Sequence, residues 1–215
     1  MIITIDGPAG AGKSSAARGL AQRLGFDLLD TGAMYRAVTL VGLRAGIDLT
    51  NQDDLARVLT VFRLEMPPGR VLVNGEDVTS AIRATEVSKA SSPVAESPVV
   101  RRRLVELQRA VAAGRDIVCE GRDQGTVVFP DAACKFFLVA SPEERAHRRH
   151  RELLARGETV SWDKVLHDQQ ERDRRDASRD LAPMVPAADA IILDSTHLSL
   201  AQVIDRMEEE ARRQR

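Results

Sequence analysis

The sequence contains few of the residues that mark several protein classes. It has only two cysteines in 215 residues, Cys119 and Cys134, and both lie in apolar stretches. A disulfide-stabilised secreted domain is therefore excluded, and we expect two buried thiols in a reduced, cytoplasmic protein. No apolar run approaches the ~18 residues of a membrane span, so we expect no membrane partner.

Lysine and aromatic residues are also scarce. Lysine occurs at only four positions, so arginine supplies most of the 31 basic residues, and the net charge is −1. A nucleic-acid partner is not expected, because such proteins show a basic excess. Arginine suits bidentate binding of phosphate and carboxylate, although a GC-rich genome also raises its frequency. Aromatics are only 3%, but 43% hydrophobic residues suffice for a core.

Short apolar runs alternate with amphipathic stretches along the chain. The runs predicted as buried strands are Ile2–Ile5, Phe26–Leu29, Ile117–Cys119, Phe136–Val139 and Ile191–Leu193. A helix is predicted over Ser14–Leu24, a capping box over Ser141–Glu144, and a last helix after Ser199. This alternation predicts an α/β fold, with a five-stranded parallel sheet and helices on both faces.

Two segments depart from this alternation. Residues 54–95 contain the pair Asn74-Gly75 after alternating β residues, which predicts a small antiparallel insert with short helices. A helix from Pro98 to about Ala113 follows it. Residues 143–180 predict two charged helices joined near Gly157, with nine Arg and one Lys against ten acidic residues. We expect a core of residues 1–53 and 96–215, with 143–180 as a lid and 54–95 as the insert.

A phosphate-binding motif follows the first predicted strand. It is the segment Gly7-Pro8-Ala9-Gly10-Ala11-Gly12-Lys13-Ser14, which matches G-x-x-x-x-G-K-[ST], and Ser15 follows it. Its glycines let backbone N–H groups converge on an anion, and the helix that begins near Lys13 adds its positive end. We expect Lys13 to contact the terminal phosphates of ATP and the Ser14 hydroxyl to bind Mg²⁺.

The rest of the sequence narrows the class of nucleotide-binding protein. The only asparagines, Asn51 and Asn74, do not precede a lysine, so the base-reading motif of GTPases is missing. A motor or AAA-type ATPase would be longer. Clusters that combine arginine with carboxylate follow predicted strands or end the charged helix pair: 30–36, 120–126 and 171–179. The sequence therefore favours a small-molecule phosphotransferase.

With these motifs the sequence resembles the bacterial cytidylate kinases, the CMP and dCMP kinases of the nucleoside monophosphate kinase superfamily. The resemblance covers nearly the whole chain. Its most specific parts are Asp30-Thr31-Gly32-Ala33-Met34-Tyr35-Arg36 and Gly121-Arg122-Asp123-Gln124-Gly125-Thr126. The segment before the helix at Pro98 also resembles the monophosphate-binding insert of that family.

The resemblance implies a role for each matching residue. It places Arg36 and Arg122 at the phosphate of the acceptor, Thr31, Arg101, Asp123 and Arg179 near the cytosine, and Ser92, Arg172 and Asp176 around the sugar. Arg101 is one of three adjacent arginines, so the same predicted helix offers three candidates, Arg101, Arg102 and Arg103, for this role. The resemblance also implies ATP as donor, CMP and dCMP as substrates, and a monomer.

The expected reaction needs no general base, since a nucleotide monophosphate is already mostly dianionic at neutral pH. We expect arginines of the helix pair to lie over the transferred group, among them Arg172 and Arg175, with Arg145, Arg148, Arg149 and Arg156 as further candidates. Asp30 is one candidate acidic partner of the metal. The alternatives are a kinase for UMP, AMP or shikimate, an RNA-binding or regulatory module, and a structural protein that retains the motif without using it.

Overall fold

The computed structural model describes residues 1–214, which divide into two compact units. The first unit comprises Met1–Leu29 and Gly114–Arg215, and the second comprises Asp30–Ala113. The predicted insert of residues 54–95 falls within the second unit, together with the helices on either side of it. In the part of the chain that the structure describes, no helix is both long and apolar enough to span a bilayer.

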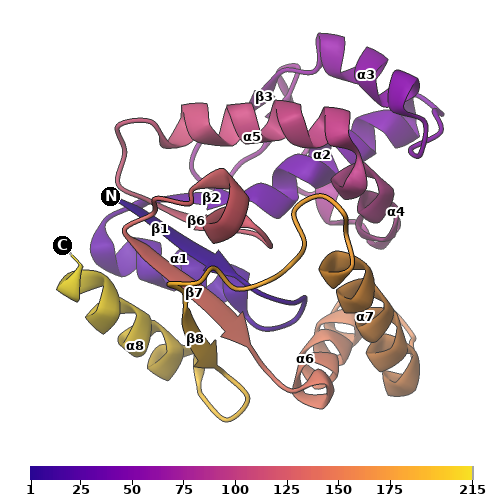
Figure 1. Ribbon diagram of the computed structural model, residues 1–215. Coiled ribbons are helices and arrows are strands. Elements are labelled where there is room, and N and C mark those ends of the chain that lie inside the picture. Colours follow the sequence, from indigo (N-terminus) through magenta and orange to yellow (C-terminus); the bar gives the residue numbers. More distant parts are fainter. Residues whose placement is uncertain (215) are drawn as a thin grey trace. The chain divides into compact units, whose positions relative to one another are not determined.

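A five-stranded sheet forms the centre of the first unit, in the order β2-β6-β1-β7-β8 (Figure 1). Its strands are β1 (Ile2–Asp6), β2 (Asp27–Asp30), β6 (Ile117–Glu120), β7 (Cys134–Val139) and β8 (Ile191–Asp194). The register is parallel, with β1 between β6 and β7, so that Ile5 is opposite both Glu120 and Phe136. The predicted α/β class with five parallel strands is confirmed.

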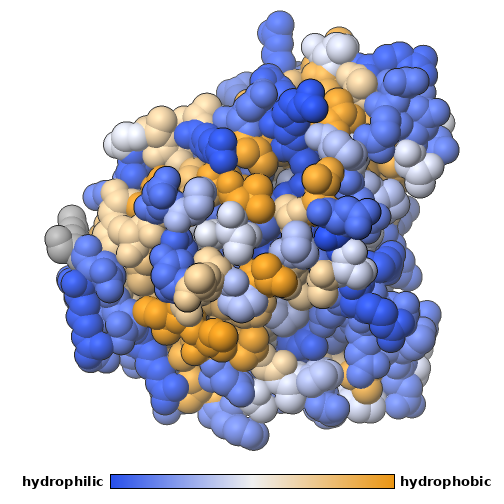
Figure 2. Space-filling view, viewed as in Figure 1, coloured by the Kyte–Doolittle hydropathy of each residue, from blue (hydrophilic) through white to orange (hydrophobic). Residues whose placement is uncertain are grey.

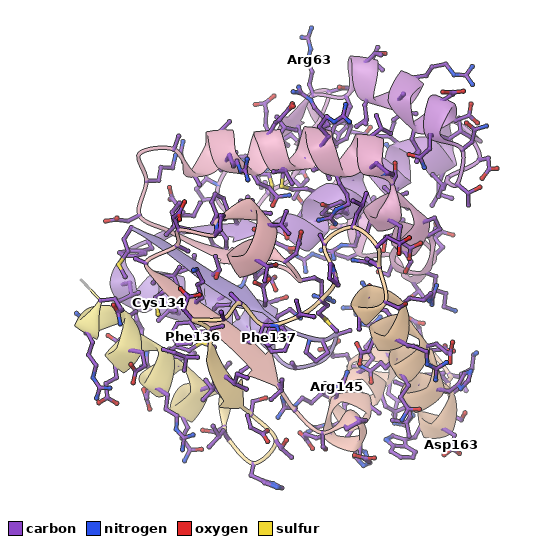
Figure 3. All side chains as sticks on the ribbon, in the orientation of Figure 1. Arg63, Cys134, Phe136, Phe137, Arg145 and Asp163 are labelled. Carbon is purple, nitrogen blue, oxygen red and sulfur yellow. The ribbon has the colours of Figure 1, made fainter. Side chains whose placement is uncertain are left out.

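Helices α1 (Lys13–Leu24) and α8 (Leu200–Arg213) pack together against one face of this sheet. Ile3, Ile5, Leu20 and Met207 are fully buried between them and the strands. The opposite face of β1 carries Thr4 and Asp6, against which the short π-helical turn η2 (Gln124–Val128) lies. Alternation along β1 therefore separates an apolar face from a polar one. Figure 3 shows Cys134, Phe136 and Phe137 along the neighbouring strand β7.

The predicted charged helix pair consists of α6 (Pro142–Ala155) and α7 (Trp162–Ala177), which pack side by side (Figure 1). Ser141 caps α6 by accepting a hydrogen bond from the Glu144 N–H. The reciprocal half of the predicted capping box is wrong. The Ser141 N–H donates to the Thr196 hydroxyl at 2.9 Å, and the Glu144 carboxylate accepts from Arg148.

The second unit is built on helices with a small sheet. Its elements are α2 (Thr31–Arg44), α3 (Gln52–Val61), β3 (Leu64–Glu65), β4 (Leu72–Val73), β5 (Glu76–Asp77), η1 (Ala81–Arg83), α4 (Thr85–Glu96) and α5 (Pro98–Ala112). Strands β3-β4-β5 pair antiparallel, and Val73 is opposite Glu76. The two residues between them, Asn74 and Gly75, have φ of 51° and 84°, as a tight primed turn requires. The predicted hairpin is confirmed.

On the face of the molecule that Figure 2 shows, hydrophobic residues occur in separate patches among hydrophilic ones. Among the exposed apolar side chains is Ile192, 60% exposed, on the edge strand β8. Both cysteines are buried as predicted, and burial raises the pKa of Cys119 to about 12 and that of Cys134 to about 11.

Candidate active site

The loop between β1 and α1 has the backbone of an anion-binding nest. Gly7, Gly10 and Gly12 have φ of 132°, 78° and 95°, values that side-chain-bearing residues rarely adopt. A Cβ on Gly7 would also collide with the Leu138 carbonyl oxygen. Gly12 is the N-cap of α1, so the loop delivers its N–H groups at the positive end of a helix.

Lys13 lies at the start of α1 and is only 5% exposed. Its Nζ donates to the Pro8 carbonyl oxygen at 2.7 Å, across the predicted phosphate loop. Burial, and then the charge of Arg122, hold the pKa of Lys13 well below its ordinary value, while Glu120 and Asp6 oppose the shift. An anionic ligand at this loop would stabilise the ammonium form.

The loop after β6 is fixed to the end of β1. The Gly121 N–H donates to the Ile5 carbonyl at 3.1 Å. The two oxygens of the Asp6 carboxylate accept separately, Oδ1 from the Gln124 N–H at 2.9 Å and Oδ2 from the Gly125 N–H at 2.8 Å. Asp6 is 4% exposed, and burial raises its pKa to about 6 against the effect of these bonds. The loop carries Arg122 and Asp123, two predicted acceptor-binding residues.

Asp176 on α7 gathers several of the predicted site residues. Its carboxylate accepts from Arg122 Nε at 3.1 Å, pairs closely with Arg179, and lies 4.0 Å from Arg172 Nε. Burial raises the pKa of Asp176, but the charges of Arg122, Arg179 and Arg172 outweigh it and hold the pKa below its ordinary value. Four predicted residues from two segments, 120–126 and 171–179, therefore form one cluster.

Arg175 does not join that cluster. It is exposed, and its Nε donates to the Glu171 carbonyl at 3.4 Å on its own helix. Such a contact within one helix is typical of a solvent-exposed helix face. The structure therefore does not place Arg175 beside the other predicted site residues.

Helices α6 and α7 contact the phosphate loop through Arg145, Arg148 and Asp173. These contacts with the loop backbone were not predicted from the sequence. Arg145 Nη1 donates to the Ala9 carbonyl at 3.0 Å and pairs with Asp173, which accepts from the Ala9 N–H at 3.3 Å. Figure 3 shows Arg145 on α6. Arg148 and the Ser195 hydroxyl reach the Ala11 carbonyl at 3.3 and 3.1 Å. Arg145 and Arg148, two of the predicted candidates for contact with the transferred phosphoryl group, contact the loop backbone in the structure.

In the second unit, the predicted residues lie on three helices. Thr31 is the first residue of α2 and is buried, and Arg36 on the same helix pairs with Asp30 at 3.3 Å. Asp30 also caps α2 by accepting from the Ala33 N–H, so both its contacts serve this unit. Ser92 is buried in α4.

The register of the three adjacent arginines on α5 is resolved by the structure. Arg101 is 7% exposed, whereas Arg102 and Arg103 are exposed. The Arg101 guanidinium lies 6.0 Å from the centre of the Tyr35 ring and donates to the Ala95 carbonyl at 3.2 Å. Only Arg101 therefore faces the interior of the second unit.

The exposed Ser14 hydroxyl at the start of α1 is a hard oxygen ligand of the kind that Mg²⁺ prefers.

The histidines of the helix pair have local partners. The His147 ring packs on Trp162 with centroids 5.2 Å apart, and His150 Nε2 lies 2.9 Å from the Val160 carbonyl. Within residues 1–214, no group of three or more His, Cys, Asp or Glu side chains is placed to hold a metal ion.

Comparison with known proteins gives a consistent assignment. The family model "Cytidylate kinase" matches residues 3–213. A cytidylate kinase of Pelotomaculum thermopropionicum is 53% identical, covering 94% of this chain and 92% of that protein. That of Solibacter usitatus is 47% identical, covering 94% and 88%.

Solved structures with a similar fold are more distant in sequence. The shikimate kinase of Bacteroides thetaiotaomicron has a TM-score of 0.50 at 12% identity, covering 99% of this chain and 98% of that one. At this identity the likeness bears on the fold alone. The sequence relatives carry the finer assignment: this chain belongs to the cytidylate kinase family.

Proposed function

We propose that this protein transfers the γ-phosphoryl group of ATP to CMP and dCMP, giving ADP and CDP or dCDP. The observation that carries the proposal is the cluster in which Arg122, Arg172 and Arg179 surround Asp176, in the same unit as the phosphate loop. Family membership supports the cytidine nucleotides as acceptors. The structural likeness to a shikimate kinase does not favour shikimate, because the identity is only 12%.

The donor side of the proposed site is the glycine loop with Lys13. Its N–H groups and the Lys13 ammonium would bind the phosphates of ATP. The Ser14 hydroxyl would hold Mg²⁺, which, when bound, neutralises charge on the phosphates. The contacts of Arg145 and Arg148 with Ala9 and Ala11 keep the loop in this shape before the nucleotide arrives.

The acceptor side is proposed from the resemblance. Arg122 and Arg36 would bind the acceptor phosphate, and Asp123 would accept from the exocyclic amine of cytosine. Thr31, Arg101, Arg179, Ser92, Arg172 and Asp176 keep the base and sugar roles stated above. The attacking oxygen belongs to the acceptor phosphate, which is mostly dianionic at neutral pH and needs no general base.

The wider assignments are also proposals. We infer that residues 54–95 are the monophosphate-binding insert and residues 143–180 the lid, and that the protein is a cytoplasmic monomer. The two buried thiols fit a reducing compartment.

The proposal is tested by an ADP-release assay with ATP and Mg²⁺ against CMP, dCMP, UMP, AMP, GMP and shikimate. We expect kcat/KM to be highest for CMP and dCMP. A higher value for AMP, UMP or shikimate would replace the proposed acceptor. ADP release that no acceptor stimulates would contradict a kinase. A matched pair of variants, Lys13→Ala in the loop and Lys164→Ala on exposed α7, separates loop-dependent transfer from a contaminating activity.

A further inference from the structure

Asp6 is the last residue of β1, and its buried carboxylate has no part in the roles described so far. Thr4 and Asp6 lie on the face of β1 that carries η2, opposite the apolar face of Ile3 and Ile5. A carboxylate that is 4% exposed is costly to bury, so it requires hydrogen-bond donors around it.

The partners of Asp6 are the first two N–H groups of η2. A helical turn leaves its first N–H groups without partners inside the turn, and a side chain usually caps them from the N-cap position. Here the N-cap residue is Asp123, a residue type well suited to capping, yet its side chain makes no cap hydrogen bond. Asp6, which is 118 residues from Gln124 in sequence, takes over that task through the N–H groups of Gln124 and Gly125.

Capping of η2 by Asp6 in place of Asp123 affects the loop that carries Arg122 and Asp123. The Asp123 side chain makes no cap hydrogen bond to η2, and the turn is capped from β1 instead. The fixed N–H groups directly follow Arg122 and Asp123 in sequence, and the Gly121 N–H before them is held by the Ile5 carbonyl. The backbone on both sides of the two proposed acceptor-binding residues is therefore tied to the end of β1.

The fit around the second donor is close. A Cβ on Gly125 would lie 3.0 Å from Thr4 Oγ1 and 3.5 Å from Asp6 Oδ2. A side chain at position 125 would therefore lift the turn from the strand and lengthen the contact with Asp6. Glycine at this position lets the backbone approach the carboxylate.

We propose that Asp6 is a positioning residue for the acceptor nucleotide: by capping η2 from the neighbouring strand, it holds Arg122 and Asp123 where they bind the monophosphate. This inference rests on the proposed function, in which those two residues contact the acceptor. Asp6 itself would touch neither substrate. Its effect would appear in acceptor binding and much less in donor binding.

The test is Asp6→Asn, which keeps the size of the side chain. Each carboxylate oxygen accepts from a different N–H, so an amide can satisfy one donor and must oppose the other with its own NH₂ group. Loss of one hydrogen bond to a charged group predicts a rise in KM for CMP of about tenfold or more. We expect KM for ATP to change less than about threefold.

A matched control is Thr4→Val, on the same face of the same strand. Thr4 is fully buried and, within residues 1–214, its hydroxyl oxygen has no hydrogen-bond partner, so the isosteric change should leave both KM values unaltered. A second variant, Gly125→Ala, displaces the same N–H without changing any charge. It should give the same acceptor-selective defect to a smaller extent, and it replaces Asp6→Asn should that variant not fold.

The outcomes separate this inference from the proposed function. If the wild-type protein phosphorylates another monophosphate in place of CMP, the proposed acceptor is wrong, and the variants are measured against the acceptor that it does use. If folded Asp6→Asn shows an unchanged KM for the acceptor, or equal rises for acceptor and ATP, the positioning role is overturned. A rise confined to the acceptor supports it.

Discussion

Asp6 and Asp176 are two carboxylates of the first unit with almost the same exposure, 4% and 2%, and opposite pKa shifts. Burial raises the pKa of both. Around Asp6 the opposing partners are chiefly two backbone N–H groups, and its pKa rises to about 6. Around Asp176 they are three guanidinium groups, and its pKa falls. The charge of the partners, and not the depth of burial, sets the sign of the shift.

The difference in partners indicates that the two carboxylates have different roles. The partners of Asp6 are uncharged backbone groups that it holds in position, whereas the partners of Asp176 are cations that a phosphate or a sugar hydroxyl can also engage. The pKa of Lys13, which burial lowers, also depends on both regions, because Arg122 and Arg172 lower it further while Asp6 raises it. Variants at these positions test whether the two regions are as distinct as their electrostatics indicate.

The largest effect is expected from Lys13→Ala. Removing a donor aimed at the developing charge of a transferred group lowers turnover by about 10²–10³-fold. The fold should persist, because the hydrogen bond that the Lys13 side chain donates, to the Pro8 carbonyl, lies within its own loop. Steady-state turnover and far-ultraviolet circular dichroism check both statements. Near-normal turnover, with Lys164→Ala as the exposed control, would remove Lys13 from the proposed chemistry.

The second effect concerns stability on the Asp176 side. Asp176→Asn leaves Arg122, Arg172 and Arg179 without their shared carboxylate, which should lower the free energy of unfolding by about 3 kcal/mol. We choose the lower end of the usual range because Arg122 and Arg172 are partly exposed. Urea unfolding measures the change.

The control for this variant lies on the same helix. Asp168→Asn breaks an exposed pair with Lys164 at 3.4 Å and should change the free energy of unfolding by less than about 1 kcal/mol. Equal unfolding midpoints for the two variants would show that the arginine cluster does not depend on Asp176.

The sequence predicts the fold well, but it places the ends of four of the five strands one residue early. Strands β1, β2, β6 and β8 each continue through one acidic residue beyond the predicted apolar run, namely Asp6, Asp30, Glu120 and Asp194, whereas β7 ends at Val139 as predicted. Hydrophobicity marks the buried part of a strand, whereas the backbone ladder continues into the residue that faces the site. A polar residue directly after an apolar run is therefore a signal for site residues, as the clusters at 30–36 and 120–126 illustrate.

The candidate site was predictable where a motif is contiguous and not where contacts are distant in sequence. The glycine loop follows from eight adjacent residues, and the choice of Arg101 needed the helix register that only the structure supplies. The contacts of Asp6 with Gln124, and of Asp173 with Ala9, join residues 118 and 164 apart. Local propensity carries no information on such pairs.

The pH dependence of stability should distinguish Asp6 from Asp176 by sign. The pKa of Asp6 is about 6 in the folded chain against an ordinary 3.8, so the folded state binds the proton first as pH falls. The contribution of Asp6 to stability therefore decreases as pH rises from about 4 to about 6, by about 2 to 3 kcal/mol. The lowered pKa of Asp176 gives the opposite trend, because its stabilisation is lost as pH falls below about 4.

Urea unfolding of the wild type and of Asp6→Asn across this range isolates the Asp6 contribution, since the other carboxylates are common to both. The stability of the wild type relative to the variant should fall as pH rises. Unfolding is a better readout than activity here, because the acceptor phosphate also titrates near pH 6. A constant difference between pH 4 and 6.5 would contradict the raised pKa.

The smallest effect is expected from Asp123→Ala, and it sharpens the comparison from the Asp6 side. Asp123 is proposed to accept from the exocyclic amine of cytosine, which uracil lacks, so its loss should reduce the CMP/UMP ratio of kcat/KM by about tenfold. The charge of Asp123 also raises the pKa of Asp6, so the variant should reduce the fall in stability between pH 4 and 6. A reduced slope with an unchanged CMP/UMP ratio would make Asp123 an electrostatic neighbour of Asp6 with no part in base selection. A reduced slope together with a reduced CMP/UMP ratio would show that the two carboxylates act together, with Asp6 holding the loop and Asp123 distinguishing cytosine from uracil.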